Sequence, residues 1–328
     1  MNTSRDYFDP EVLSRLKGLG LRARLIVEGY VSGVHRSPMH GFSVEFAEHR
    51  EYAPGDDLRY LDWKVYGRSD KFYLKQFEEE TNLACHLVLD VSESMTYRGP
   101  AGASAAEADG PNGSARSARG VSPMTKLEYA QTVSAALTYL VLHQQDCVAL
   151  ATFDDGLRSI LGPSNNPSRL QQFTEMMEAV EPRRKTAIAP VLHELAQRWT
   201  RRGIVIVLSD FFDSVDTLLE GLKHLRYRRQ EVILFHVLDR AELAFPFDGA
   251  IRFQGLEQGA ELSVESRALR KAYLREFDEY LRQLRFGCRA AGIDYALMPT
   301  DQPVDVALSS YLAARHARGF RRSGRPAT

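Results

Sequence analysis

The residues best suited to chemistry follow a short apolar run in the first third of the chain. Leu87 to Leu89 predicts a buried strand that stops at Asp90, and two hydroxyls follow at alternate positions, Ser92 and Ser94. A strand ending in Asp-x-Ser-x-Ser places one carboxylate and two hydroxyls on a single turn. Such oxygen ligands suit a hard divalent cation, above all Mg²⁺, which keeps several waters and takes few protein carboxylates. The motif therefore predicts a metal site.

A second carboxylate ends another apolar run. Asp210 closes the segment that starts at Gly203, and Thr186 lies between the two strands, just before an expected helix. In an open α/β sheet the carboxyl ends of the strands meet at one edge, where ligands bind. Asp90 and Asp210 would then lie together, with Thr186 as a third hydroxyl. The alternative is that the two aspartates are helix caps or turn residues, and that Thr186 caps the helix after it.

Apolar periodicity predicts strands that alternate with helices over most of the chain. Such alternation is typical of a parallel sheet covered on both faces, so the expected fold class is α/β with a doubly wound, mostly parallel sheet. Strands are expected at 72–78, 83–90, 147–153, 157–161 (an edge), 203–210, 232–238 and 293–298. Helices are expected near 10–31, from 126, at 167–180, from 187, and at 214–228, 266–290 and 303–317, with an insertion or β excursion at 240–265.

Bulk properties exclude several classes of protein. The 328 residues are 44% hydrophobic and 26% charged, which fits a globular protein with a sizeable core. A formal net charge of −1 argues against a protein built mainly to coat nucleic acid or an anionic membrane, and it leaves room for a local basic patch. The three cysteines form no CxxC pair, and the polar amino terminus and the lack of a long apolar stretch predict neither a signal peptide nor a transmembrane helix. We therefore expect a cytoplasmic protein.

Two motifs together resemble a known family. Asp-x-Ser-x-Ser after one strand, a Thr in a later loop and an Asp after a later strand resemble the metal-ion-dependent adhesion site of von Willebrand factor A domains. The upstream runs that begin at His35 and at Tyr52, the second reading Tyr-Ala-Pro-Gly-Asp-Asp-Leu-Arg-Tyr-Leu-Asp-Trp-Lys, are similar to those of bacterial proteins catalogued as domain of unknown function 58. The resemblance covers most of residues 30–300.

This resemblance implies a von Willebrand A-like, Rossmann-type sheet, a Mg²⁺ or Mn²⁺ site and a role in binding rather than catalysis. It also implies a partner, a MoxR-type AAA+ ATPase, and an unknown client protein that the two would assemble or mature. The metal ligands carried over by the motif are Asp90, Ser92, Ser94, Thr186 and Asp210. The loop before Thr186 is basic rather than glycine-rich, which makes Thr186 the least secure of these ligands.

Three regions follow from this organisation. Residues 1–80 are expected to form a family-specific amino-terminal extension packed on the sheet, 81–300 the α/β domain and 301–328 a helix with a frayed basic tail. Within the domain, 98–122 is rich in Gly, Ala and Ser and is expected to be a disordered insertion beside the metal loop.

Charged and aromatic residues in the extension form a second candidate surface. They are either a salt-bridged turn that docks the extension on the sheet or a surface that recognises a partner. The residues concerned are Arg50, Asp56, Asp57, Arg59, Asp62, Trp63 and Lys64.

Two further functions stay open from the sequence. One is a Mg²⁺-dependent phosphohydrolase that uses Asp90 or Asp210, with Arg183, Arg184 and Lys185 to neutralise the phosphate. The other is a scaffold whose metal site has lapsed and whose binding lies in residues 50–64. A P-loop ATPase is excluded because the chain has no GxxxxGK[ST] sequence.

Overall fold

The computed structural model describes the backbone of residues 27, 46–51, 73–77, 84–100, 124–182, 185–254 and 261–323. Side chains are described for Val27 and from residue 84 onward within these ranges, apart from 253–264, 268 and 316–323. Apart from Val27, the predicted helix at 10–31 lies outside the described residues, as does nearly all of the extension at 1–80. Of the stretch 98–122, which was expected to be disordered, only residues 98–100 are described.

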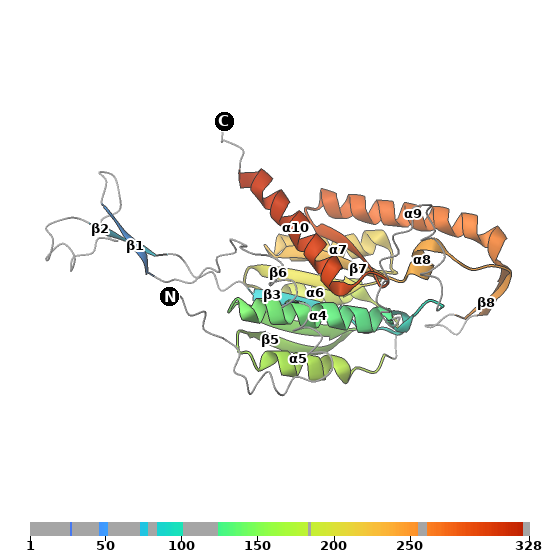
Figure 1. The fold of residues 1–328 in the computed structure, drawn as a ribbon, viewed down its shortest axis with the longest axis horizontal. Helices are drawn as coiled ribbons and strands as arrows, with labels where there is room; N and C mark the ends of the chain where they lie inside the picture. The colour runs from blue at the N-terminus through green and yellow to red at the C-terminus, as the bar shows by residue number, and fades with distance from the viewer. Residues whose placement is uncertain are drawn as a thin grey trace, which may run out of the picture.

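A six-stranded sheet forms the centre of the α/β domain (Figure 1). Its spatial order is β10-β7-β6-β3-β4-β5, and every neighbouring pair is parallel except β4 and β5. The strands are β3 (Ala84–Asp90), β4 (Cys147–Phe153), β5 (Leu157–Ser164), β6 (Gly203–Ser209), β7 (Glu231–Leu238) and β10 (Asp294–Pro299). This is the doubly wound, mostly parallel sheet that the alternation of strands and helices predicted.

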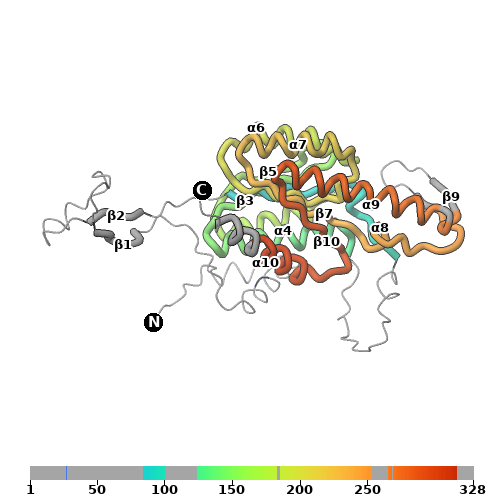
Figure 2. The backbone as a smooth tube through the Cα atoms, turned by 90° about the horizontal axis from the view of Figure 1, so that it is seen from above, coloured from blue at the N-terminus to red at the C-terminus, as the bar shows by residue number. Residues whose placement is uncertain are grey.

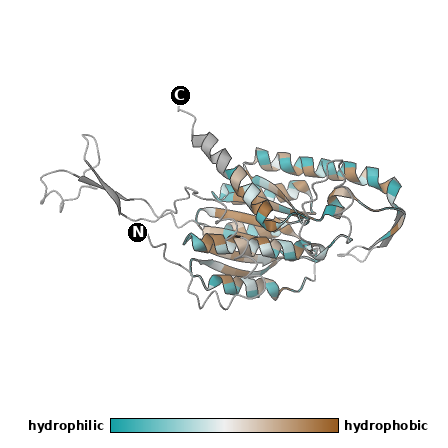
Figure 3. Cartoon of the chain, viewed as in Figure 1, coloured by the Kyte–Doolittle hydropathy of each residue, from teal (hydrophilic) through white to brown (hydrophobic). Residues whose placement is uncertain are grey.

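Helices cover both faces of this sheet, and Figure 2 shows α6 and α7 on one side with α4 and α10 on the other. One face carries α4 (Lys126–His143), α5 (Arg169–Glu178) and α10 (Val304–Ser323), whose apolar residues share one core cluster. The other face carries α6 (Ile188–Arg198), α7 (Val215–Tyr227) and α9 (Ser266–Ala290), which share a second core cluster. Successive strand residues such as Val88 and Leu89 enter opposite clusters, so central strands must be apolar on both faces. Figure 3 accordingly shows hydrophobic strands and a hydrophilic outer side of α9.

The remaining described elements are short. The helices η2 (Glu93–Thr96) and α8 (Arg240–Ala244) follow β3 and β7 directly. Two antiparallel pairs lie outside the large sheet, β1 (Phe46–Glu51) with β2 (Tyr73–Phe77) and β8 (Ala250–Gln254) with β9 (Glu261–Glu265). The segment expected as an insertion or β excursion at 240–265 therefore contains a helix and a β-hairpin. None of the described helices combines the length and the apolar character needed to span a membrane.

The element boundaries agree with the sequence predictions to within a few residues, and the helix at 266–290 agrees at both ends. The carboxyl-terminal tail is an exception. The helix was predicted to end near residue 317, before a frayed tail, but α10 continues to Ser323. No proline interrupts this segment, and the arginines there favour helix, so the chain stays helical past Gly319.

A buried histidine makes the stability of this sheet depend on pH. His86 in β3 stacks on Trp199 with ring centroids 4.2 Å apart, and burial lowers its pKa to about 4. An unfolded histidine has a pKa near ~6.5, so between these values the unfolded chain binds more protons than the folded one. Protonation of His86 therefore does not reduce the free energy of unfolding above the unfolded pKa, and it reduces this free energy progressively as the pH drops toward 4.

We predict that His86→Phe, which keeps a ring against Trp199, reduces this pH dependence. Between pH ~6.5 and pH ~4, His86 should lower the free energy of unfolding of the natural chain by up to about 1.4 kcal/mol for each pH unit. Urea unfolding of both proteins from pH 7.5 to 4.5 measures the difference. An unchanged slope in His86→Phe would contradict the assignment.

Candidate functional site

The sheet changes its winding direction between β3 and β6. The chain passes from β3 through α4 to β4 on one side, and later returns through α6 to β6 on the other side of β3. At such a switch point the loops after the two strands diverge and leave a crevice at the carboxyl edge. Asp90 ends β3 and Asp210 directly follows β6, so the topology places both predicted carboxylates there.

Asp90 is fully buried and held by hydrogen bonds on both oxygens. Its Oδ1 accepts from the backbone N–H of Ser92 at 2.9 Å, and its Oδ2 accepts from the hydroxyl of Ser209 at 2.5 Å. The helix η2 then turns the chain so that the Ser92 and Ser94 hydroxyl oxygens lie 3.1 Å apart. The Asp-x-Ser-x-Ser motif thus forms the compact turn that the sequence predicted. Asp90 caps neither η2 nor any other described helix, since the N-cap of η2 is Ser92.

The loop after β6 is held in a conformation that side chains rarely adopt. Phe211 has φ 51°, in the left-handed region, and its N–H donates to Ser209 Oγ at 2.9 Å. The hydroxyl of Tyr280 donates to the Phe211 carbonyl, and His236 Nε2 donates to the Asp210 carbonyl at 2.8 Å. Such strained residues persist where the surroundings determine their conformation, often at functional sites. The loop therefore fixes the position of the Asp210 carboxylate.

Thr186 reaches the same edge by a different contact. The N–H of Ala187 donates to the carbonyl of Asp154 at 2.9 Å, and Asp154 follows Phe153, which pairs with Asp90 across β3 and β4. The cap of α6 is Ala187, without a side-chain hydrogen bond, so the alternative that Thr186 caps this helix is wrong. The Thr186 hydroxyl is buried and has no hydrogen-bond partner in the described structure. A buried unsatisfied hydroxyl calls for a ligand or water.

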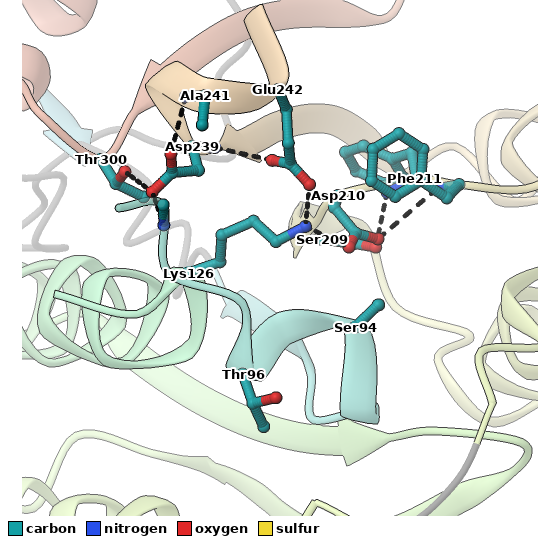
Figure 4. Close-up of polar contacts among 12 residues, drawn as sticks. Ser94, Thr96, Lys126, Ser209, Asp210, Phe211, Asp239, Ala241, Glu242 and Thr300 are labelled. Atoms are coloured by element: carbon teal, nitrogen blue, oxygen red, sulfur yellow. Dashed lines mark hydrogen bonds and ion pairs between the residues drawn. The ribbon is translucent and has the colours of Figure 1, made fainter. Parts of the chain in front are cut away.

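Lys126 belongs to this site, although the sequence gave no reason to expect it. Its Nζ donates to Asp210 Oδ2 and to Glu242 Oε1, both at 2.7 Å, and the side chain is fully buried (Figure 4). Thr125 and Glu128 form a capping box that starts α4 at this point. A lysine in the first turn of a helix usually faces solvent, so only the contacts of Lys126 with Asp210 and with Glu242 of α8 reveal its role.

The rings of Tyr97 and Phe212 complete the surroundings of the ammonium group, with centroids 5.7 and 4.9 Å from Nζ. Burial opposes the charge of Lys126, but Asp210 and Glu242 outweigh it and raise the pKa of the amine. Lys126 therefore stays protonated and serves as a permanent positive charge at the carboxyl edge.

Asp239 anchors α8 beside this group. Its Oδ1 accepts from the N–H of Ala241 at 2.7 Å, while Oδ2 accepts from the N–H of Gly99 at 3.0 Å and from Thr300 Oγ1 at 3.2 Å. The segment after η2, the end of β10 and α8 are thus tied to one carboxylate. This anchor fixes Glu242 where it meets Lys126.

Among the residues that the structure describes, no basic side chain forms a salt bridge with the Asp90 carboxylate. Burial raises its pKa, and the charge of Asp210 raises it further, while hydrogen bonds from Ser209 and Ser92 act in the opposite direction. A cation close to Asp90 would favour the ionised form. The site therefore has the electrostatic character of a cation site.

The donor set suits Mg²⁺ or Mn²⁺ because it consists of carboxylate and hydroxyl oxygens only. Asp90, Ser92, Ser94 and Asp210 gather at one edge and Thr186 joins them there. Within the described residues no group of three or more His, Cys, Asp or Glu side chains is placed to hold a metal, so the hydroxyls would have to complete the shell. Of the second candidate surface, Arg50 lies in β1 without a described side chain, and Asp56, Asp57, Arg59, Asp62, Trp63 and Lys64 lie outside the described residues.

Comparison with known proteins identifies the family. Residues 48–106 and 111–281, more than half of the chain, match the family described as "Protein of unknown function DUF58". The chain belongs to this family, as the two sequence motifs indicated. It is 24% identical over 316 residues to "Uncharacterized protein Mb1516" of Mycobacterium bovis and to "Uncharacterized protein Rv1480" of Mycobacterium tuberculosis, covering 94% of this chain and 92% of each relative.

Similar solved structures include BatB from Bacteroides thetaiotaomicron, with 14% identity, a TM-score of 0.40 and coverage of 71% of this chain and 98% of that one. An aerotolerance-related membrane protein from Bacteroides fragilis is 17% identical, with a TM-score of 0.42 and coverage of 70% of this chain and 96% of that one. The SpRpn10 VWA domain is 11% identical, with a TM-score of 0.38 and coverage of 69% of this chain and 93% of that one.

Removing the ammonium group should destabilise the chain strongly. Lys126→Met leaves two buried carboxylates, Asp210 and Glu242, without their cation, and we expect a loss of about 3–5 kcal/mol in the free energy of unfolding. Lys126→Met combined with Glu242→Gln should lose less, because one of the two uncompensated charges is gone. Urea unfolding in the presence of a chelator measures both.

The matched control is Lys223→Met, which removes the same charge from an exposed position on α7. It should change stability by no more than about 0.5 kcal/mol. If Lys126→Met proved as stable as the control, the buried ion pairs could not be holding this edge together.

Proposed function

We propose that this chain is a metal-dependent protein-interaction module that binds Mg²⁺ or Mn²⁺ at the carboxyl edge of its sheet. One observation supports the proposal above all: the buried charges there do not balance. Asp90, Asp210, Asp239 and Glu242 are acidic side chains at this edge, and Lys126 is the one basic side chain among the described residues that forms a salt bridge with any of them. When these carboxylates are ionised the negative charge exceeds the positive charge, so a divalent cation would offset part of the excess, and buried charges require such pairing.

The ligands would be Asp90, Ser92, Ser94, Thr186 and Asp210. The unpaired hydroxyl of Thr186 supports this choice, since it is buried at the same edge. When bound, Mg²⁺ would supply open coordination positions to which an acidic side chain of another protein can bind. The chain's own part is to hold the oxygens in place, through the Ser209 bond to Asp90 and the fixed loop at Phe211.

A binding role, rather than catalysis, is proposed from the state of His236, the histidine that contacts the Asp210 carbonyl. His236 uses Nε2 on the Asp210 carbonyl and Nδ1 on Tyr295, and burial lowers its pKa to about 3. It is therefore neutral and fully engaged, and cannot serve as a general acid or base near neutral pH. For the phosphohydrolase alternative, Lys185 is exposed and Arg183 and Arg184 lie outside the described residues, so no observation favours that reaction.

The partner we propose is a MoxR-type AAA+ ATPase, and its support is the family resemblance. A carboxylate of the ATPase or of a client protein would complete the metal shell, so that movement driven by nucleotide could pass to the client. Lys126 already pairs with Asp210, which should keep metal affinity modest in the isolated chain. A carboxylate from the partner would add the negative charge that strengthens it.

We predict that the natural chain binds one Mg²⁺ or Mn²⁺ and that Asp90→Asn weakens binding at least tenfold, since the neutral amide loses the main charge attraction. Thr186→Val, which keeps the shape of the side chain, should weaken binding by a smaller factor. Isothermal titration calorimetry on the full-length chain gives both values, first alone and then with the MoxR-type ATPase added.

Asp216→Asn is the matched control, because it removes the same charge from an exposed position in the first turn of α7. It should bind metal as the natural chain does. Equal metal binding by Asp90→Asn and the natural chain would remove the proposed site. Metal binding without any effect of the ATPase would keep the site and reject the partner.

A further inference from the structure

The opposite edge of the sheet carries a group of arginines that the proposed function does not use. Arg201 and Arg202 precede β6, and Arg228 and Arg229 lie in the turn between α7 and β7. All four are exposed. Thr200, Arg202, Arg228 and Arg229 line a cavity of about 440 Å³ between the two turns. The strands place this cavity at the amino ends of β6 and β7, about 20 Å from Asp210 at ~3.3 Å per strand residue.

A buried glutamine holds the two arginine turns together. Gln230 is fully buried, and its Nε2 donates to the carbonyl of Trp199 at 3.0 Å and to that of Arg201 at 2.7 Å. Arg226 in turn donates to the Gln230 carbonyl at 3.0 Å, and Arg229 has φ 64°, in the left-handed region. The backbone under the cavity is therefore fixed, which keeps the arginines close together although their charges repel.

The charge of these arginines is not neutralised within the described part of the chain. Several other arginines of the domain pair with a nearby carboxylate, as Arg275 does with Glu276 and Arg282 with Glu279. Other such pairs are Arg158–Asp154, Arg198–Glu194, Arg240–Asp301, Arg267–Asp248 and Arg315–Glu231. Among the described residues, Arg202, Arg228 and Arg229 have no such carboxylate within ion-pair distance. A concentrated positive charge is left for an external anion.

Two exposed aromatic side chains lie at the same end of the domain. Tyr227 is 87% exposed and directly precedes Arg228, and Phe286 is 72% exposed on α9, which packs on α7. Aromatic residues beside basic ones are typical of surfaces that contact the headgroup region of a membrane.

We propose that Thr200, Arg202, Arg228 and Arg229 form a binding site for a phosphate group. Guanidinium groups bind phosphate oxygens through paired N–H donors. A group of several arginines therefore suits a multiply charged phosphate better than it suits a single carboxylate. The phosphate can come from the headgroup of an anionic phospholipid or from a soluble phosphate compound. Tyr227 distinguishes the sources, because it would add to binding only at a lipid surface. The site does not involve the metal ligands.

The test compares the double variant Arg228→Gln/Arg229→Gln with a control, Arg275→Gln/Arg282→Gln. Both variants lose two exposed positive charges, but the control changes arginines that already have carboxylate partners. One arm measures binding of inorganic pyrophosphate by calorimetry on the full chain. The other measures sedimentation with vesicles of phosphatidylglycerol and phosphatidylcholine, and with phosphatidylcholine alone, for these proteins and for Tyr227→Ala.

We expect at least one arm to show binding that falls tenfold or more in Arg228→Gln/Arg229→Gln, stays unchanged in the control and weakens with salt. Loss of vesicle binding in Tyr227→Ala as well would identify the lipid headgroup as the source. Binding of pyrophosphate without vesicles would identify a soluble ligand. The proposal is overturned if neither probe binds, or if the two double variants behave alike. Titration of Mg²⁺ into the same arginine variants tests the metal site separately, because these variants keep all of the proposed metal ligands.

Discussion

The ammonium group of Lys126 joins three parts of the chain that are far apart in sequence. It comes from the first turn of α4 and contacts the carboxylates of Asp210 after β6 and of Glu242 in α8. Because these groups are buried, none can separate without leaving a charge uncompensated in a medium that solvates it poorly. The carboxyl edge therefore behaves as a unit, and a change at Asp210 is felt at α8.

Much of this architecture follows from local patterns in the sequence. Gly203 to Leu208 is apolar at every position after the glycine, as a strand covered on both faces must be. The helix at 266–290 repeats its apolar residues at helical spacing and ends where Gly292 takes a left-handed conformation. Asp90 and Asp210 could be placed together from topology alone, because strand order fixes which loops meet at the carboxyl edge.

Features that depend on how elements pack together could not be predicted in this way. Lys126 and Glu242 are 116 positions apart, and each lies in a helical turn where a charged residue usually faces water. From the sequence, Thr186 could be a metal ligand or the cap of the next helix. The structure excludes the cap, because Ala187 holds that position, and it leaves the Thr186 hydroxyl without a hydrogen-bond partner among the described residues. The arginines of the opposite edge lie in two turns that are distant in sequence, and Gln230 links these turns through hydrogen bonds. In each case the missing information is the register of one element against another.

The net charge of −1 hides a separation of charge along strand β6. Strand β6 has the buried carboxylate of Asp210 at one end and Arg201 and Arg202 at the other, with an apolar, buried interior between them. Net charge close to zero argues against a protein coated by nucleic acid, but the local potential depends on how the charges are distributed. A strand with opposite charges at its two ends is therefore compatible with the cation site proposed at one edge and the anion site proposed at the other. Because residues 203–208 of β6 are apolar and separate the two edges, a ligand at one proposed site would not displace a ligand at the other.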